Sequence, residues 1–128
     1  MQWEINYFEK EGIIVVKTSG VIEWDDHKTM CQEMRTLADK HGVSKFLADH
    51  RDLQDGLSIL QIDDLPGMLK EIGTKPNDKI AVIYNKEIEN KYRFFQSVAF
   101  LASLNFKIFT DEEKAMQWLL TPSDNFNS

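Results

Sequence analysis

Short hydrophobic blocks recur along the whole chain, and their spacing changes between a period of two and a period of about four. Trp3, Ile5 and Tyr7 alternate with their neighbours, and a β-branched run begins at Ile13. A period of two is typical of a strand, so we expect strands over residues 3–8 and 13–19. The turn at Gly12 joins them most simply as an antiparallel hairpin, and Gly20 is expected to end the second strand.

The next block has helical spacing. Met30, Met34 and Leu37 follow the acidic pair Asp25-Asp26, which favours a helix start, and Lys40-His41-Gly42 is a typical helix end. Beyond it we expect strands at 46–48, 80–84 and 106–109, and helices at 58–72, 88–103 and from Thr110 onward. Pro66-Gly67 is expected to break the helix at 58–72. Thr110 and Glu113 form the pattern of a capping box.

The resulting order is β-β-α-β-α-β-α-β-α. Strands separated by helices predict an α/β domain with a mixed, mainly parallel sheet, helices packed on the sheet and an antiparallel edge from the first hairpin. The 128 residues fit one domain, which we place at 1–121. Residues 122–128 are polar apart from Phe126, and we expect a flexible tail there.

Composition narrows the possible partners. The net charge is −6 and the pI is about 5.0, which disfavours nucleic acid and anionic membrane surfaces. No apolar run approaches the roughly 20 residues of a spanning helix. Cys31 is the single cysteine, so no disulfide can form within the chain. The beginning of the sequence lacks the pattern of a signal peptide, and we expect a cytoplasmic protein.

Three stretches together resemble the SpoIIAA-like fold of STAS domains and of the bacterial proteins labelled STAS/SEC14-like. Gly12-Ile13-Ile14-Val15-Val16 leads to Gly20 and an acidic helix start. Ala48-Asp49-His50-Arg51-Asp52 leads to Leu57-Ser58. Phe109-Thr110-Asp111-Glu112-Glu113 leads to Ala115 and Trp118-Leu119. The likeness extends from about Trp3 to Leu120, and it implies the fold more directly than a function.

The resemblance implies one further comparison. In STAS domains that antagonise anti-sigma factors, a phosphorylated serine follows the third strand in an Asp-x-Ser context. The matching place here reads Asp49-His50-Arg51, and the nearest hydroxyl is Ser58. Ser58 is expected either to cap the following helix or, when phosphorylated, to lie favourably at that helix N-terminus.

Asp49, His50, Arg51 and Asp52 form the main candidate binding site. They follow a predicted parallel strand, and ligands of open α/β sheets usually bind at that end of the strands. Arg51 is suited to hold a phosphate or carboxylate, and the alternative is that it pairs with Asp49 or Asp52 to fix the loop. Ser58 and Tyr84 complete this candidate ligand or partner site.

Other reactive residues give no catalytic constellation. His27 and Cys31 share a helix face, but a zinc site needs about four ligands and no second pair has ligand spacing. The glycines form neither a Walker loop nor a dinucleotide fingerprint. We therefore expect no metal, no cofactor and no enzymatic activity.

The predicted helix at 88–103 is apolar over much of its circumference. Such a helix needs more than one layer of partners, which a deep core, an apolar ligand cavity or a dimer would provide. For a dimer or a protein partner, the expected contact residues are Tyr92, Phe94, Val98 and Leu101.

Two binding functions remain open from the sequence, beside a less favoured enzyme that would use Asp49, His50 and Arg51 together. The first is a non-enzymatic, STAS-like regulatory module that binds a protein partner or a second copy of itself. The second is a carrier or sensor of a small apolar or lipid-like ligand, held near Asp49–Asp52, Ser58, Tyr84 and the aromatic helix.

Overall fold

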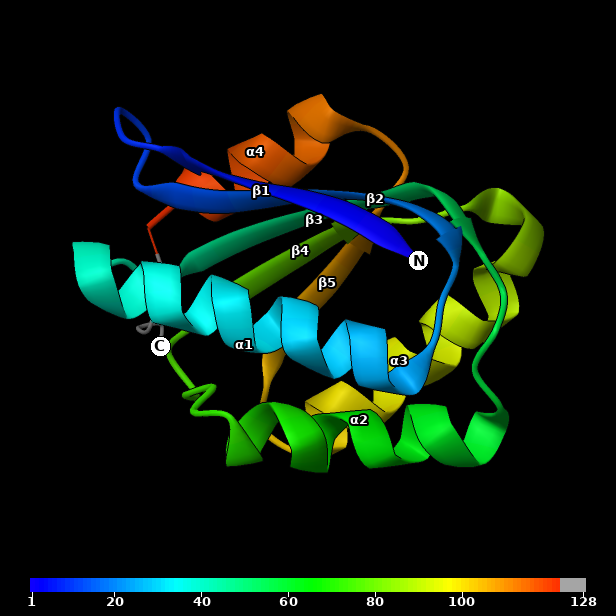
Figure 1. Cartoon of the computed structure of the whole chain (residues 1–128). Coiled ribbons are helices and arrows are strands. Elements are labelled where there is room, and N and C mark those ends of the chain that lie inside the picture. Colours follow the sequence, from blue (N-terminus) through cyan, green and yellow to red (C-terminus); the bar gives the residue numbers. More distant parts are fainter. Residues whose placement is uncertain (123–128) are drawn as a thin grey trace.

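The computed structural model describes residues 1–122 and consists of a five-stranded sheet with helices on both faces (Figure 1). The observed order of strands and α-helices is the one predicted from the sequence. The strands are β1 (Gln2–Phe8), β2 (Ile13–Val21), β3 (Lys45–Gln54), β4 (Lys79–Ile83) and β5 (Asn105–Phe109). The helices are α1 (Trp24–His41), α2 (Ile59–Glu71), the short 3₁₀ helix η1 (Lys86–Ile88), α3 (Glu89–Leu101) and α4 (Glu112–Leu120). The predicted tail falls, from residue 123 onward, outside the described residues.

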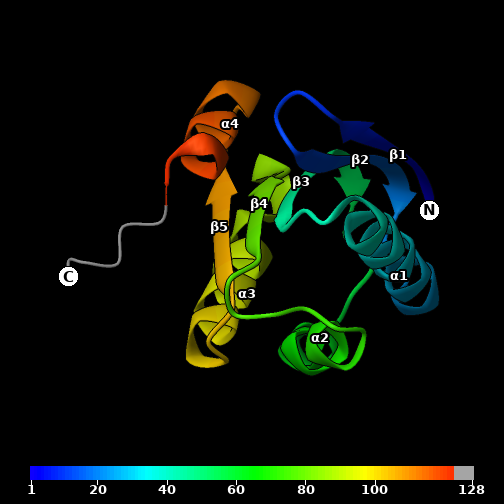
Figure 2. The same cartoon turned by 90° about the vertical axis from the view of Figure 1, so that its left-hand side faces the viewer.

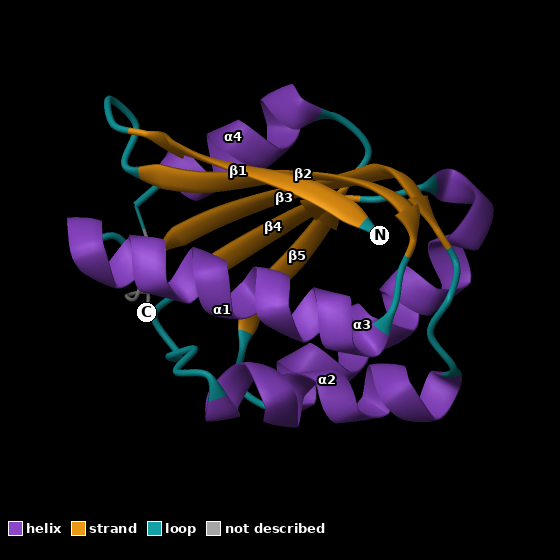
Figure 3. Cartoon of the chain, viewed as in Figure 1, coloured by secondary structure: helices purple, strands orange, loops and turns teal. Residues whose placement is uncertain are grey.

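The sheet has the strand order β1-β2-β3-β4-β5, with β1 antiparallel to β2 and the other neighbours parallel (Figure 3). The hairpin therefore forms the antiparallel edge that its turn predicts. The carboxyl ends of β2, β3, β4 and β5 lie along one edge, because these strands run in the same direction. Side chains that follow any of these strands are thus brought toward one another.

The two faces of the sheet are covered unequally, and Figure 2 shows α4 on the side of the sheet opposite α1 and α2. On one face Ile14, Val16 and Phe46 pack beneath Met30 and Met34 of α1. On this same side, residues of α2 and α3 form an adjoining cluster. On the other face the sheet packs against α4. The core on that side consists of Ile13, Leu47, Ala81, Ile83, Ala115 and Leu119.

Two helix ends agree with their sequence signals. Gly42 adopts a left-handed conformation with φ 65° at the end of α1, which a residue without a side chain reaches at little cost. Ser58 accepts a hydrogen bond from the backbone N–H of Gln61, and the Gln61 side chain accepts one from the Ser58 N–H. Ser58 is therefore an N-cap within a reciprocal capping box.

Four predictions about where an element begins, ends or breaks were wrong. Strand β2 continues through Gly20 to Val21, and β3 continues through Asp49–Asp52 to Gln54, because each strand supplies the other's ladder partners. Helix α2 runs unbroken through Pro66, since its buried face holds the helix on the core despite the lost backbone donor. The cap of α4 is Asp111, not Thr110, and its carboxylate accepts from the Lys114 N–H at 2.8 Å.

Candidate ligand cavity

A cavity of about 130 Å³ lies between the sheet and the helices α1, α2 and α3. Strands β3 and β4 form its floor, and the three helices form its walls. The lining is mostly apolar and includes Phe46, Ala48, Val82, Met34, Leu65 and Phe95. A space of this size with apolar walls has room for a compact apolar group, since an engineered cavity of about 150 Å³ binds benzene.

His50 gives the cavity a polar end. The side chain is 5% exposed and lines the cavity from β3. Between Lys17 and Ser19 the β2–β3 register shifts, so that two residues of β3, His50 and Arg51, lie opposite Thr18. This bulge lets the Thr18 hydroxyl reach both the carbonyl oxygen of Asp49, at 3.1 Å, and Nδ1 of His50, at 2.7 Å. The imidazole is thus fixed through one nitrogen.

His27 and Cys31 lie on the neighbouring wall, as their spacing on one helix predicts. The Cys31 Sγ and His27 Nδ1 atoms are 3.8 Å apart, and the His27 and His50 rings are 6.2 Å apart between centroids. Burial raises the pKa of the Cys31 thiol to about 12 and lowers the pKa of His27 to about 4. Burial, reinforced by His27 and opposed by Asp49, lowers the pKa of His50 to about 3. At neutral pH all three side chains are uncharged.

Tyr92 of α3 completes the polar end. Its ring lies 6.4 Å from the His50 ring and 5.8 Å from the Tyr84 ring, between centroids. Burial, assisted by the charge of Asp55, raises the pKa of Tyr92, so its phenol stays protonated. The Tyr84 hydroxyl donates to Glu89 at 3.0 Å and is directed to the start of α3. Tyr84 therefore supports Tyr92 through ring packing.

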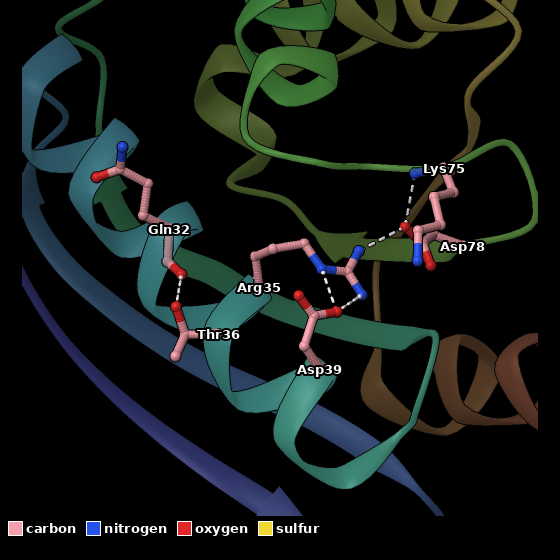
Figure 4. Close-up of polar contacts among 6 residues, drawn as sticks. All are labelled: Gln32, Arg35, Thr36, Asp39, Lys75 and Asp78. Atoms are coloured by element: carbon pink, nitrogen blue, oxygen red, sulfur yellow. Dashed lines mark hydrogen bonds and ion pairs between the residues drawn. The ribbon is translucent and has the colours of Figure 1, made fainter.

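Charged side chains lie at two ends of the cavity, and each is paired. At one end the Lys91 Nζ donates to Asp55 at 2.7 Å and to the carbonyl oxygen of Leu57 at 2.5 Å. At the other end Arg35 donates to Asp78 and Asp39, as Figure 4 shows. Both cations are therefore already neutralised by carboxylates of this chain.

The cluster Asp49–Asp52 is divided by the alternation of the strand. His50 points into the cavity, whereas Arg51 pairs with Asp49 through contacts of 2.9 and 2.7 Å, away from it. Burial alone would raise the pKa of Asp49, but the hydrogen bonds and charge of Arg51 lower it overall. Asp52 and Ser58 are exposed. Of the proposed interface residues, Leu101 is 81% exposed, whereas Tyr92, Phe94 and Val98 are partly buried against the core.

Sequence reasoning missed Thr18 and the placement of His27 and Cys31 beside the same cavity as His50. The alternation of side chains along a strand could have placed Thr18 and His50 on the cavity side of the sheet. Thr18 continues the face of Ile14 and Val16, and His50 continues the face of Phe46 and Ala48. Within residues 1–122, no group of three or more histidine, cysteine or acidic side chains is arranged to hold a metal ion.

A comparison with protein families matches residues 13–120 to the family described as SpoIIAA-like. The chain belongs to the SpoIIAA-like family. The match covers most of the sheet, including β2 with Thr18 and β3 with His50, and all the helices. A comparison with curated proteins gave no match. Among the described residues, no helix has both the length and the apolar character needed to cross a membrane.

Proposed function

We propose that this SpoIIAA-like domain acts by binding, and that it holds a small apolar molecule between its sheet and α1–α3. The observation that carries the proposal is the cavity of about 130 Å³ with apolar walls and a polar end at His50. Its volume favours a ligand of about the size of a substituted benzene ring over a long-chain lipid. The ligand hypothesis from the sequence is thereby narrowed to a compact molecule.

The chemistry of the lining supports binding over catalysis. Nucleophilic catalysis by cysteine requires the thiolate, and the raised pKa of Cys31 keeps the thiol protonated. General acid–base catalysis works best with a pKa near the working pH, and the pKa values of His27 and His50 lie well below neutrality. These groups serve better as neutral hydrogen-bonding partners.

A ligand in this position would regulate the domain by stabilising its helices on the sheet. Any molecule that binds the folded state alone stabilises it in proportion to the logarithm of its concentration above Kd. Because the cavity is lined by α1, α2 and α3, its occupant would hold all three helices against β3 and β4. A change in helix mobility would then be the signal that a partner protein detects.

The direct test is a titration of the folded protein with toluene, followed by amide NMR and by thermal unfolding. We expect chemical-shift changes at residues such as Ala48, Leu65 and Phe95, and a higher Tm. Native mass spectrometry after purification would identify a natural ligand. Saturating toluene that shifts neither these amides nor the Tm would contradict the proposal.

A second candidate function is self-association or protein binding through α3. It is supported by Phe100 and Leu101, which are 78% and 81% exposed next to each other at the end of this helix. Phe94 and Val98 would contribute their exposed edges, whereas Tyr92 lines the cavity. Sedimentation velocity at high concentration tests it, with Leu101→Glu expected to convert a dimer into a monomer. A wild-type protein that sediments as a monomer would contradict the self-association.

A further inference from the structure

We infer that the ligand is an uncharged molecule with a hydroxyl group, which donates its proton to Nε2 of His50. This inference rests on the proposed function and specifies the chemistry of the occupant. It follows from the hydrogen bonds around His50, from the pairing of the charged side chains, and from the size of the cavity.

The tautomer of His50 follows from its contact with Thr18. The hydroxyl of Thr18 has one proton, and the carbonyl oxygen of Asp49 can only accept. When Thr18 donates to this carbonyl, the 2.7 Å contact with His50 requires a proton on Nδ1. A neutral imidazole with Nδ1–H leaves Nε2 as an acceptor. The bulge between β2 and β3 thereby leaves His50 with a hydrogen-bond acceptor, Nε2, toward the cavity.

Nε2 has no hydrogen-bond partner among residues 1–122. The same residues contain no unpartnered polar side-chain atom that is fully enclosed, so Nε2 borders accessible space. Since His50 is 5% exposed and lines the cavity, that space is the cavity. An acceptor in an apolar enclosure favours a ligand that brings a donor, because an unsatisfied buried polar group is costly.

The charged residues exclude an ionic ligand. A carboxylate in the cavity would need a free cation, but Arg35 is held by Asp78 and Asp39, and Lys91 by Asp55. An ammonium ligand would need a free anion, and Asp55 is already paired with Lys91. Transfer of an unpaired charge into an apolar site is far more costly than transfer of a hydroxyl. Among neutral molecules that bring a donor, an alcohol or phenol is the simplest class that fits a cavity of this size.

The test compares phenol with toluene, two probes of nearly equal shape. The quantity measured, by calorimetry or NMR titration, is the ratio of the toluene Kd to the phenol Kd. This ratio cancels the apolar contribution to binding free energy that the two probes share. In the wild type, phenol is expected to bind at least as tightly as toluene. In His50→Phe the ratio is expected to fall tenfold or more, because the hydroxyl loses its acceptor.

A variant pair at Thr18 isolates the tautomer. Thr18→Val removes the group that fixes the Nδ1 proton and is expected to lower the ratio, whereas Thr18→Ser keeps the hydroxyl and should preserve it. Long-range ¹H–¹⁵N NMR of the unaltered protein reads the tautomer directly, so the inference does not depend on whether a variant folds. We expect Nδ1–H and an unprotonated Nε2.

Each outcome separates this inference from the proposed function. A proton on Nε2, or a ratio that His50→Phe leaves unchanged, overturns the hydroxyl inference while toluene binding still supports the cavity. Binding of benzoate more tightly than phenol also overturns it. Failure of both toluene and phenol to bind overturns the ligand function itself.

Discussion

Arg35 of α1 and Asp78, immediately before β4, form an ion pair with a 2.7 Å contact between Nη1 and Oδ2. The Asp78 side chain is 1% exposed, and the same carboxylate oxygen also accepts from the Lys75 N–H at 2.8 Å. Figure 4 shows the guanidinium between Asp78 and the more exposed Asp39. This pair connects the segment between α2 and β4 to α1, and Arg35 also lines the cavity.

Removal of Asp78 is therefore expected to be far more damaging than removal of Asp39. Asp78→Ala leaves the Arg35 charge buried without its main partner, and we expect a loss of about 3–5 kcal/mol in unfolding free energy. Asp39→Ala breaks an exposed contact within one helix and should cost about 0.5 kcal/mol or less. Urea denaturation measures both. Equal losses of unfolding free energy in the two variants would show that the buried Arg35–Asp78 pair contributes no more than the exposed Arg35–Asp39 contact.

Gly56 and Gly67 form a second contrasting pair. A β-carbon at Gly56 would overlap the carbonyl oxygen of Ile22, whereas a β-carbon at Gly67 meets nothing within 4 Å. We expect Gly56→Ala to destabilise the fold by about 2 kcal/mol or more, through displacement of backbone where the chain leaves β3. Gly67→Ala lies inside α2 and should stabilise it by roughly 0.5–1 kcal/mol. Thermal unfolding of the two variants decides this, and a stable Gly56→Ala protein would contradict it.

Two alanines test whether the space above Ala48 accepts additional side-chain volume. Ala48 lies on the cavity floor, and Ala81 is fully buried on the opposite face beneath α4. Ala48→Val should fill part of the cavity with little loss of stability and weaken toluene binding by tenfold or more. Ala81→Val should overpack its core and cost about 1–3 kcal/mol. Similar destabilisation at both positions, with toluene affinity unchanged, would argue that the floor at Ala48 has no spare volume.

The two histidines of the cavity predict a loss of stability in mild acid. Their folded-state pKa values of about 4 and about 3 lie below the ordinary histidine value near 6.5, so the unfolded chain takes up protons first as the pH falls. The contribution of these neutral histidines to the free energy of unfolding is complete above about pH 6.5 and declines as the pH falls toward 4. The slope should reach up to about 1.4 kcal/mol per pH unit for each histidine.

Denaturation at a series of pH values measures this slope. His50→Gln is expected to reduce it between pH 6.5 and 4, while its stability difference from the wild type stays constant between pH 7 and 9. The Asp49–Arg51 ion pair is expected to break only at lower pH, because Arg51 lowers the pKa of the Asp49 carboxyl group. A stability that stays flat from pH 7 to 4.5 would contradict the buried neutral state of both histidines.

The sequence by itself determined the order of strands and helices, because hydrophobic spacing and end signals such as Gly42 and Ser58 act over a few residues. It also placed His27 and Cys31 on one helix face and His50 near the carboxyl edge of the sheet. Local rules misplaced the end of β3 and the continuity of α2. In both cases, contacts with distant segments outweighed a local preference, through the β2 ladder for Asp49–Asp52 and core packing for Pro66.

Only the tertiary structure decided what the polar residues do. The alternation of side chains along β3 separates His50 from the Asp49–Arg51 pair. The register shift opposite Thr18 places the Thr18 hydroxyl against Nδ1 of the His50 imidazole. Helix docking left an apolar space beside that ring and brought Tyr92 from a helix 42 residues farther along the chain. A register shift and an unfilled volume arise from how whole elements pack, so no local pattern of residues encodes them.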